Sequence, residues 1–166
     1  AELDAMVAAI RATGRLALHV VSEGPSAVRA ALVGLAVSTA GHQGRYIPLG
    51  HGGPEVGGGG LLAASVRPEQ LDVEAALAAL RPVLEDSGIA TVGHDLKTAG
   101  LTLARHGLRL AGAAFDTMLA AYMLDATRPS HAIEDTALDY LKYQALTGDA
   151  VREFGNVSRP NCSIIE

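Results

Sequence analysis

The sequence predicts an α/β domain, and three observations lead to this prediction. Short apolar runs of strand length alternate with longer segments whose apolar residues recur at helical spacing. Residues 91–125 show the end of a strand, a helix that stops at Gly107, a short apolar strand and a second helix that Asp116 caps. Apolar residues make up 49% of the chain and aromatic residues only 4%, so the core must be aliphatic. The length suits one domain of about 100–200 residues.

The first part of the chain predicts a helix followed by three strands. Residues 1–13 form an amphipathic helix whose buried side is Leu3, Met6, Val7 and Ile10. Strands are expected at residues 16–21, 31–38 and 45–49, joined as an antiparallel meander. The glycine-rich run at residues 50–60 lacks the Gly-Lys-Ser/Thr ending of a phosphate-binding loop, and we interpret it as a mobile surface loop.

The second part predicts four helices and two short strands. A helix at residues 68–86 buries Leu71, Val73, Ala76, Leu77, Leu80 and Leu84, and a strand follows at residues 89–92. The helix after Asp95 is expected to bury Leu96, Leu101, Leu103 and Ala104, and a short apolar strand leads to Asp116. The helix after Asp116 is expected to bury Leu119, Tyr122 and Met123. A last helix, residues 131–142, should turn Ile133, Ala137, Leu138 and Leu141 inward.

Two segments carry a resemblance to a known family: Val92-Gly93-His94-Asp95-Leu96-Lys97 and Phe115-Asp116-Thr117-Met118-Leu119. With the first two strands, they resemble the proofreading 3'-5' exonuclease domain of bacterial family A DNA polymerases. This resemblance implies a ribonuclease H-like fold, in which helices flank a mixed five-stranded sheet. It covers roughly residues 1–145. We therefore expect an exonuclease-like domain at residues 1–147 and a C-terminal tail at residues 148–166, either disordered or foreign to the natural chain.

The resemblance also implies where a two-metal nuclease site should lie. In this family the metal ligands are an Asp-x-Glu pair on the first strand, an Asp in the second motif, and a Tyr-x-x-x-Asp on a later helix. The matching positions hold His19, Val21 and Ala99, and no acid stands four residues after Tyr140 or Tyr143. Valine and alanine carry no donor atom, and histidine is a poor ligand for Mg²⁺. We therefore expect no catalytic residue, no bound metal and no other cofactor.

Four displaced carboxylates are weak alternative ligands: Glu23, Asp95, Asp116 and Glu134. Mg²⁺ or Mn²⁺ would be a cofactor only if these side chains rebuilt a site. Asp116 is better explained as a helix N-cap, and Asp95 as an acid favoured by the dipole at a helix start. Glu23 stands near a strand end, and Glu134 is expected to be a solvated acid in the first turn of a helix.

Charge and composition restrict the partners. The formal net charge is −5 and the basic residues are scattered, which argues against strong DNA binding by this chain alone. No apolar run approaches the roughly 20 residues that span a bilayer, so no membrane segment is expected. The single cysteine, Cys162, cannot form a disulfide within the chain and fits the cytoplasm.

We interpret the chain as an exonuclease-like domain of a family A DNA polymerase, an enzyme of DNA replication and repair. It would lack 3'-5' exonuclease activity and serve a structural role toward the polymerase domain of the same protein, with DNA bound weakly or only in that context. Two alternatives stay open. One is an active metal-dependent 3'-5' exonuclease that uses the displaced carboxylates. The other is a free-standing interaction module, which would need an exposed apolar patch.

Overall fold

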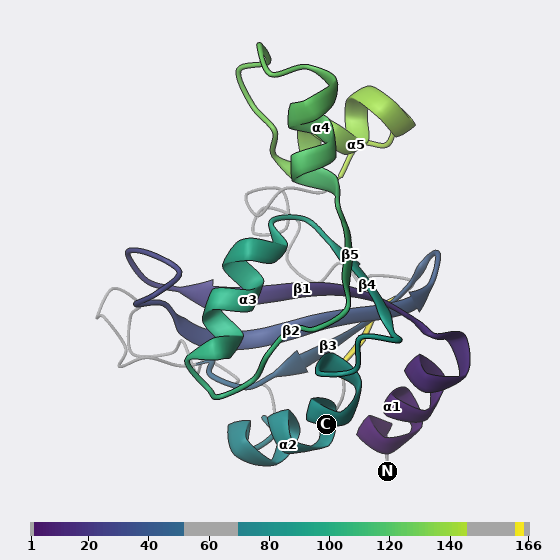
Figure 1. The fold of residues 1–166 in the computed structure, drawn as a ribbon, viewed down its shortest axis with the longest axis vertical. Coiled ribbons are helices and arrows are strands. Elements are labelled where there is room, and N and C mark those ends of the chain that lie inside the picture. The colour runs from purple at the N-terminus through teal and green to yellow at the C-terminus, as the bar shows by residue number, and fades with distance from the viewer. Residues whose placement is uncertain (1, 52–69, 146–161, 165–166) are drawn as a thin grey trace, which may run out of the picture.

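The structure is a computed structural model that describes residues 2–51, 70–145 and 162–164 (Figure 1). In chain order the elements are α1 (Glu2–Thr13), β1 (Arg15–Glu23), β2 (Ala31–Ala40), β3 (Gln43–Pro48), α2 (Val73–Leu84), β4 (Ala90–Gly93), α3 (Leu96–Ala104), β5 (Ala113–Asp116), α4 (Thr117–Leu124), α5 (Ile133–Leu141) and β6 (Cys162–Ile164). Within these described ranges, none of the helices has the length and apolar character needed to cross a membrane.

One mixed sheet in the order β5-β4-β1-β2-β3-β6 joins the strands. β1, β2 and β3 form an antiparallel meander, while β4 runs parallel to β1 and β5 runs parallel to β4. The predicted α/β class and its five strands are confirmed. A short sixth strand, β6, pairs in parallel with β3 and falls inside the segment predicted to be a tail. The rest of that segment, and the glycine run beyond His51, lie outside the described residues.

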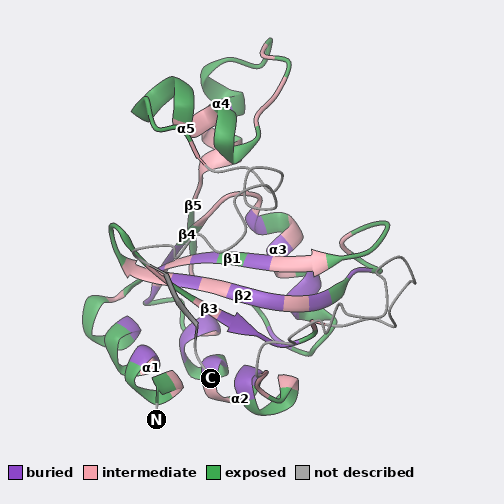
Figure 2. Ribbon diagram, turned by 180° about the vertical axis from the view of Figure 1, so that it is seen from behind, coloured by how far each residue is buried: buried purple, intermediate pink, exposed green. Residues whose placement is uncertain are grey.

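Alternating residues of β1 divide the sheet into a core face and an opposite face. Leu16, Leu18 and Val20 are buried, and Leu18 and Val20 lie beside Val37 and Leu35 of β2. Residues of three helices complete this hydrophobic core: Met6 and Ile10 of α1, Leu77, Leu80 and Leu84 of α2, and Ala99 and Leu103 of α3. Figure 2 shows buried residues along the strands and the inner sides of these helices. The predicted buried sides of α1 and α2 are confirmed.

The predicted buried face is wrong for α4 and α5 and right only in part for α3. In α3 Leu96 and Leu103 are buried as predicted, whereas Leu101 is 38% exposed and Ala104 is also exposed. In α4 Tyr122 and Met123 are exposed, and only Ala121 is buried. No residue of α5 is buried, and its apolar residues Ile133, Leu138 and Leu141 are all exposed. For α4 and α5 the physical reason is visible in Figure 1, where both helices stand beyond the end of β5 and away from the sheet.

A close backbone approach at Gly112 generates a stability prediction. A Cβ atom at Gly112 would lie 1.9 Å from the carbonyl oxygen of Ile89, a backbone atom that cannot move without shifting the strand. We expect Gly112→Ala to lower the free energy of unfolding by about 1–3 kcal/mol through overpacking. Gly100→Ala is the matched control, because a Cβ there meets nothing within 4 Å. In the helix interior this control should stabilise by about 0.5–1 kcal/mol. Urea denaturation measures both; equal effects would contradict the close approach.

Candidate functional site

The two β1 positions implied as metal ligands lie on the same face of the sheet. His19 is exposed and Val21 is half-buried, and both point away from the core face. In the strand register His19 pairs with Ala36 of β2, which in turn pairs with Tyr46 of β3. Tyr46 is therefore the next large side chain on this row, and burial raises the pKa of its hydroxyl. This row across three strands contains no carboxylate.

The third implied position, Ala99, lies in the hydrophobic core. Its side chain is 5% exposed and belongs to the same buried cluster as Leu18 and Leu103. His19 and Val21 alternate with Leu18 and Val20, so they lie on the face of β1 opposite to these core residues. A carboxylate introduced at position 99 would replace a methyl group in apolar surroundings.

Asp95 and Asp116 are brought together, and both act as helix caps. The carboxylate of Asp116 accepts hydrogen bonds from the backbone N–H groups of Asp95 (3.1 Å) and Leu96 (2.7 Å) at the start of α3. It also accepts from Met118 (2.9 Å) and Leu119 (3.3 Å) in α4. Asp95 has a left-handed backbone (φ 61°), and its side chain accepts from the N–H of Thr98. The prediction of Asp116 as a helix N-cap is confirmed, and Asp95, predicted only as an acid at a helix start, is also an N-cap.

The ionisation of Asp116 follows from these bonds. Burial alone would raise the pKa of its carboxyl group, but the four backbone N–H donors stabilise the charged form and together lower the pKa below its ordinary value. Both oxygens are thus engaged by the protein itself. The ionised carboxylate of Asp116 joins the starts of α3 and α4. Its oxygen lone pairs accept backbone hydrogen bonds and are therefore largely unavailable to a metal ion.

The remaining candidate ligands lie apart. Glu23 is exposed at the end of β1, and Glu134 is exposed in the first turn of α5. Across residues 2–51, 70–145 and 162–164, no group of three or more His, Cys, Asp and Glu side chains could hold a metal ion. Positions 19, 21 and 99 supply one imidazole and no carboxylate. The side chains at these positions therefore do not fit a two-metal site, which needs several oxygen ligands.

Sequence reasoning missed several polar contacts, and two of them join residues far apart in the sequence. His94 Nδ1 lies 2.8 Å from the hydroxyl of Thr117, and that hydroxyl donates to the carbonyl of Gly93. Because the hydroxyl hydrogen is already used, we assign the proton of this bond to His94 Nδ1. The other contact joins Gln70 to the backbone N–H and carbonyl of His51 (2.8 and 2.6 Å). His94 and Thr117 are 23 residues apart, and His51 and Gln70 are 19 residues apart, so no local sequence pattern indicates either pair.

Comparison with known proteins gives the family context of this geometry. Residues 65–154 match the family model described as "DNA polymerase I, ribonuclease H-like domain". The DNA polymerase I of Pseudomonas aeruginosa is 35% identical over 122 residues, which are 72% of this chain and 12% of that protein. The chain therefore spans about an eighth of the length of this curated relative.

Solved structures agree with this family. The POL domain of Pol1 from M. smegmatis, in complex with DNA primer-template and dNTP, aligns with a TM-score of 0.63 and 29% identity. The alignment covers 88% of this chain and 22% of that chain. The catalytic core of RRP6 from Trypanosoma brucei aligns with a TM-score of 0.63 over 90% of this chain and 34% of its own. At 16% identity that likeness shows the fold alone. The predicted ribonuclease H-like fold is confirmed.

The shared cap predicts a pH-dependent contribution to stability. Asp116→Ala should lower the free energy of unfolding by about 1–3 kcal/mol near neutral pH, since one helix cap is typically worth about 1 kcal/mol. The folded-state pKa of Asp116 is lowered. Its contribution is therefore fully present above the unfolded pKa of about 3.9, and it is lost as pH falls through the folded pKa. Urea denaturation of both proteins should show the difference shrinking below about pH 4.

Asp72→Ala is the control for this experiment, because Asp72 caps only α2 through one bond to the N–H of Ala75. Its effect should be smaller than that of Asp116→Ala near neutral pH. A difference between wild type and Asp116→Ala that stayed constant from neutral pH to about pH 2 would contradict the ionised shared cap.

Proposed function

The chain belongs to the ribonuclease H-like domain family of DNA polymerase I, and we propose that it works as a structural domain without 3'-5' exonuclease activity. In this proposal the polymerase part of the same polypeptide is its partner, and DNA is bound weakly or only in the context of the parent protein. The parent would act in DNA replication and repair in the cytoplasm. The observation that carries the proposal is the donor set His19, Val21 and Ala99 at the positions where the family has carboxylates.

Two-metal phosphodiester hydrolysis needs several oxygen ligands around one point. The neutral imidazole of His19 could bind a softer ion, but neither Val21 nor Ala99 offers any donor atom. Restoring the set is also costly at position 99, where the side chain lies in the core. These facts support the loss of metal-dependent cleavage.

The rival reading, an active nuclease with displaced carboxylates, has weaker support. The carboxylate of Asp116 already accepts four backbone N–H groups, and Asp95 caps α3. Recruiting either to a metal would leave helix-terminal N–H groups without their acceptor. Glu23 and Glu134 are exposed on β1 and α5, at separate places in the fold.

The structural role is supported by an apolar surface on α4 and α5. We define this α4–α5 surface by its exposed side chains: Leu119, Tyr122, Met123, Leu124, Ile133, Leu138 and Leu141. Met123 is 82% exposed and Leu141 is 75% exposed. Exposed apolar side chains gathered on two neighbouring helices are typical of an interaction site. The curated relative is about eight times longer than the matched segment, so we infer that a polymerase part of the same polypeptide covers it.

A free-standing interaction module would use the same α4–α5 surface for a separate protein. The two readings differ in one property, the presence of a polymerase part in the same polypeptide. The comparisons favour a polymerase part in the same polypeptide. The M. smegmatis structure that aligns with 88% of this chain is a POL domain.

The proposal predicts the outcome of a nuclease assay. The purified chain should leave the 3' end of labelled single-stranded DNA intact with either Mg²⁺ or Mn²⁺, because its aligned positions supply no carboxylate pair. Denaturing gel electrophoresis of the time course measures this result. Metal-dependent digestion that is abolished by Asp95→Ala and kept by Asp72→Ala would overturn the proposal.

Restoring acids tests the position of the lost site. His19→Asp/Val21→Glu places both acids on the exposed face and should change the melting temperature little in chelator. Adding Ala99→Asp should lower it clearly, because a buried unpaired carboxylate costs several kcal/mol or shifts its pKa. Thermal melts with and without Mn²⁺ compare the variants. If the acids form one site, metal should recover part of the loss by mass action. If Mn²⁺ leaves all three melts unchanged, these positions do not form a common site.

A further inference from the structure

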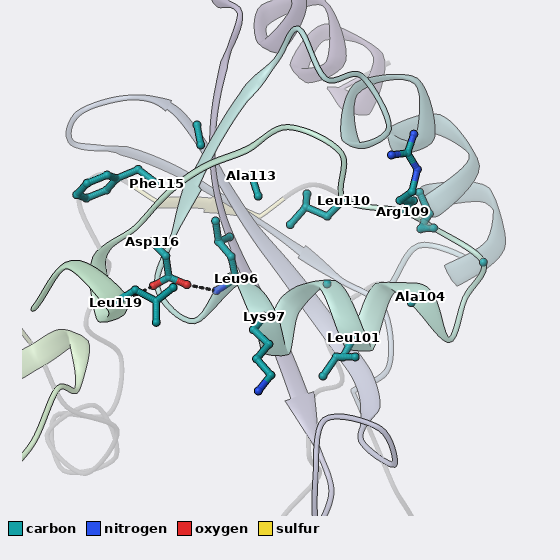
Figure 3. Close-up of a pocket in the computed structure, with 14 residues that line it drawn as sticks. Leu96, Lys97, Leu101, Ala104, Arg109, Leu110, Ala113, Phe115, Asp116 and Leu119 are labelled. Atoms are coloured by element: carbon teal, nitrogen blue, oxygen red, sulfur yellow. Dashed lines mark hydrogen bonds between the residues drawn. The ribbon is translucent and has the colours of Figure 1, made fainter. Parts of the chain in front are cut away.

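α3 and β5 border an open groove that is separate from the three implied metal-ligand positions. Its volume is about 770 Å³, and none of His19, Val21 and Ala99 lines it. Figure 3 shows aliphatic and aromatic side chains along it, including Leu96, Leu101, Leu110 and Phe115. Leu101 is 38% exposed and Phe115 is 54% exposed, so apolar area is accessible from solvent. The groove therefore offers hydrophobic burial to an occupant.

The groove carries two cations and no available anion. In Figure 3 the Lys97 side chain extends from α3 and the Arg109 side chain from the segment after α3, in opposite directions. No ion pair is found for either side chain within the part of the chain that the structure describes. The one acid among the lining residues is Asp116, whose oxygens accept four backbone N–H groups. Two cations beside one carboxylate that is already hydrogen-bonded favour an acidic partner at this groove.

The groove adjoins the α4–α5 surface. Phe115 and Leu119 line the groove, and Leu119 also belongs to the α4–α5 surface. β5 forms one edge of the described sheet and pairs only with β4 there. One occupant could thus contact the groove and α4 together.

We propose that this groove docks an amphipathic segment from the polymerase part of the same polypeptide. Aliphatic side chains of that segment would enter the groove, and acidic side chains would pair with Lys97 and Arg109. The inference rests on the proposed function for the source of the segment. The apolar and acidic character expected of the segment follows from the residues that line the groove, and it does not depend on the proposed function.

Two arguments favour an occupant on the same polypeptide. A groove of this volume admits only a few side chains, so it buries a small part of an interface. A tether supplies an effective concentration in the millimolar range, so weak contacts are enough. A nucleic acid is disfavoured, since two cations in an acidic chain provide few phosphate contacts.

Gly100 provides a way to close the groove without disturbing the fold. It lies in α3 and lines the groove, and a Cβ atom there meets nothing within 4 Å. Gly100→Leu should fill the groove, while Gly100→Ala is the matched control that keeps it open. Thermal melting verifies that both variants are folded.

The first experiment tests the chemistry with a defined probe. A fluorescein-labelled helical peptide of about 14 residues carries leucines on one side and glutamates beside them, and a second peptide has lysines in place of the glutamates. Fluorescence anisotropy with the 166-residue chain should give at least tenfold tighter binding of the acidic peptide. Gly100→Leu should weaken that binding about tenfold, and Gly100→Ala should not. Lys97→Glu/Arg109→Glu should reverse the preference, with Arg29→Glu as the control on an exposed loop.

The second experiment identifies the occupant in the full natural protein. Leu101 is replaced by the photoreactive residue p-benzoylphenylalanine, and cross-linked peptides are identified by mass spectrometry. We expect cross-links to an acidic, apolar segment of the polymerase part of the same polypeptide, and their loss in Gly100→Leu. Cross-links between two copies of the chain, cross-links to DNA, or none at all would each overturn the proposal.

The two proposals can fail separately. Digestion of DNA by the unmodified chain would remove the proposed function and leave the peptide result unaffected. Equal affinity for the acidic and basic peptides, or binding unchanged by Gly100→Leu, would remove the groove proposal and leave the nuclease result unaffected.

Discussion

The arrangement of α3 and α4 depends on the hydrogen bonds that the carboxylate of Asp116 accepts from both helix starts. α3 and α4 begin beside each other because β4 and β5 are parallel neighbours, and both helices start at the carboxyl ends of those strands. Two adjacent helix N-termini concentrate unpaired N–H groups and positive dipole ends at one place. Such a place attracts an anion from solution. Here the chain supplies the anion itself, which fixes the position of α4 relative to α3 and leaves the carboxylate committed to structure.

On β1 the core residues and the implied metal-ligand positions are different residues, so the ligands can be lost while the strand keeps its packing. Leu16, Leu18 and Val20 hold β1 in the core, and these side chains point to one face of the sheet. His19 and Val21 point to the other face and contribute little to that core. Substitution there changes the chemistry without a large loss of packing energy. A ribonuclease H-like architecture is therefore compatible with either activity or inactivity, and the site residues decide between them.

The limits of sequence-based prediction are physical and can be located. Strands and the faces of α1 and α2 could be predicted because each buries one regular side against the same core. The face of α3 could be predicted only in part, because apolar residues such as Leu101 also occur on its exposed side, while Thr102 is buried. Periodicity in α5 identifies an apolar side but carries no information about what covers it. The capping of α3 by Asp116 was missed for a related reason, since Leu96 and Asp116 are 20 residues apart.

The exposed helices give the strongest physical argument for an interface. α4 has 8 residues and α5 has 9, and isolated helices shorter than about 12–15 residues are only marginally stable in water. α5 also begins at Ala132, which provides no side-chain cap. Within the described ranges the two helices contact mainly each other and β5, so the packing that normally stabilises short helices is small. Their apolar side chains would supply that packing once covered. A neighbour that covered these side chains would stabilise both helices, and the proposed structural role requires this coupling.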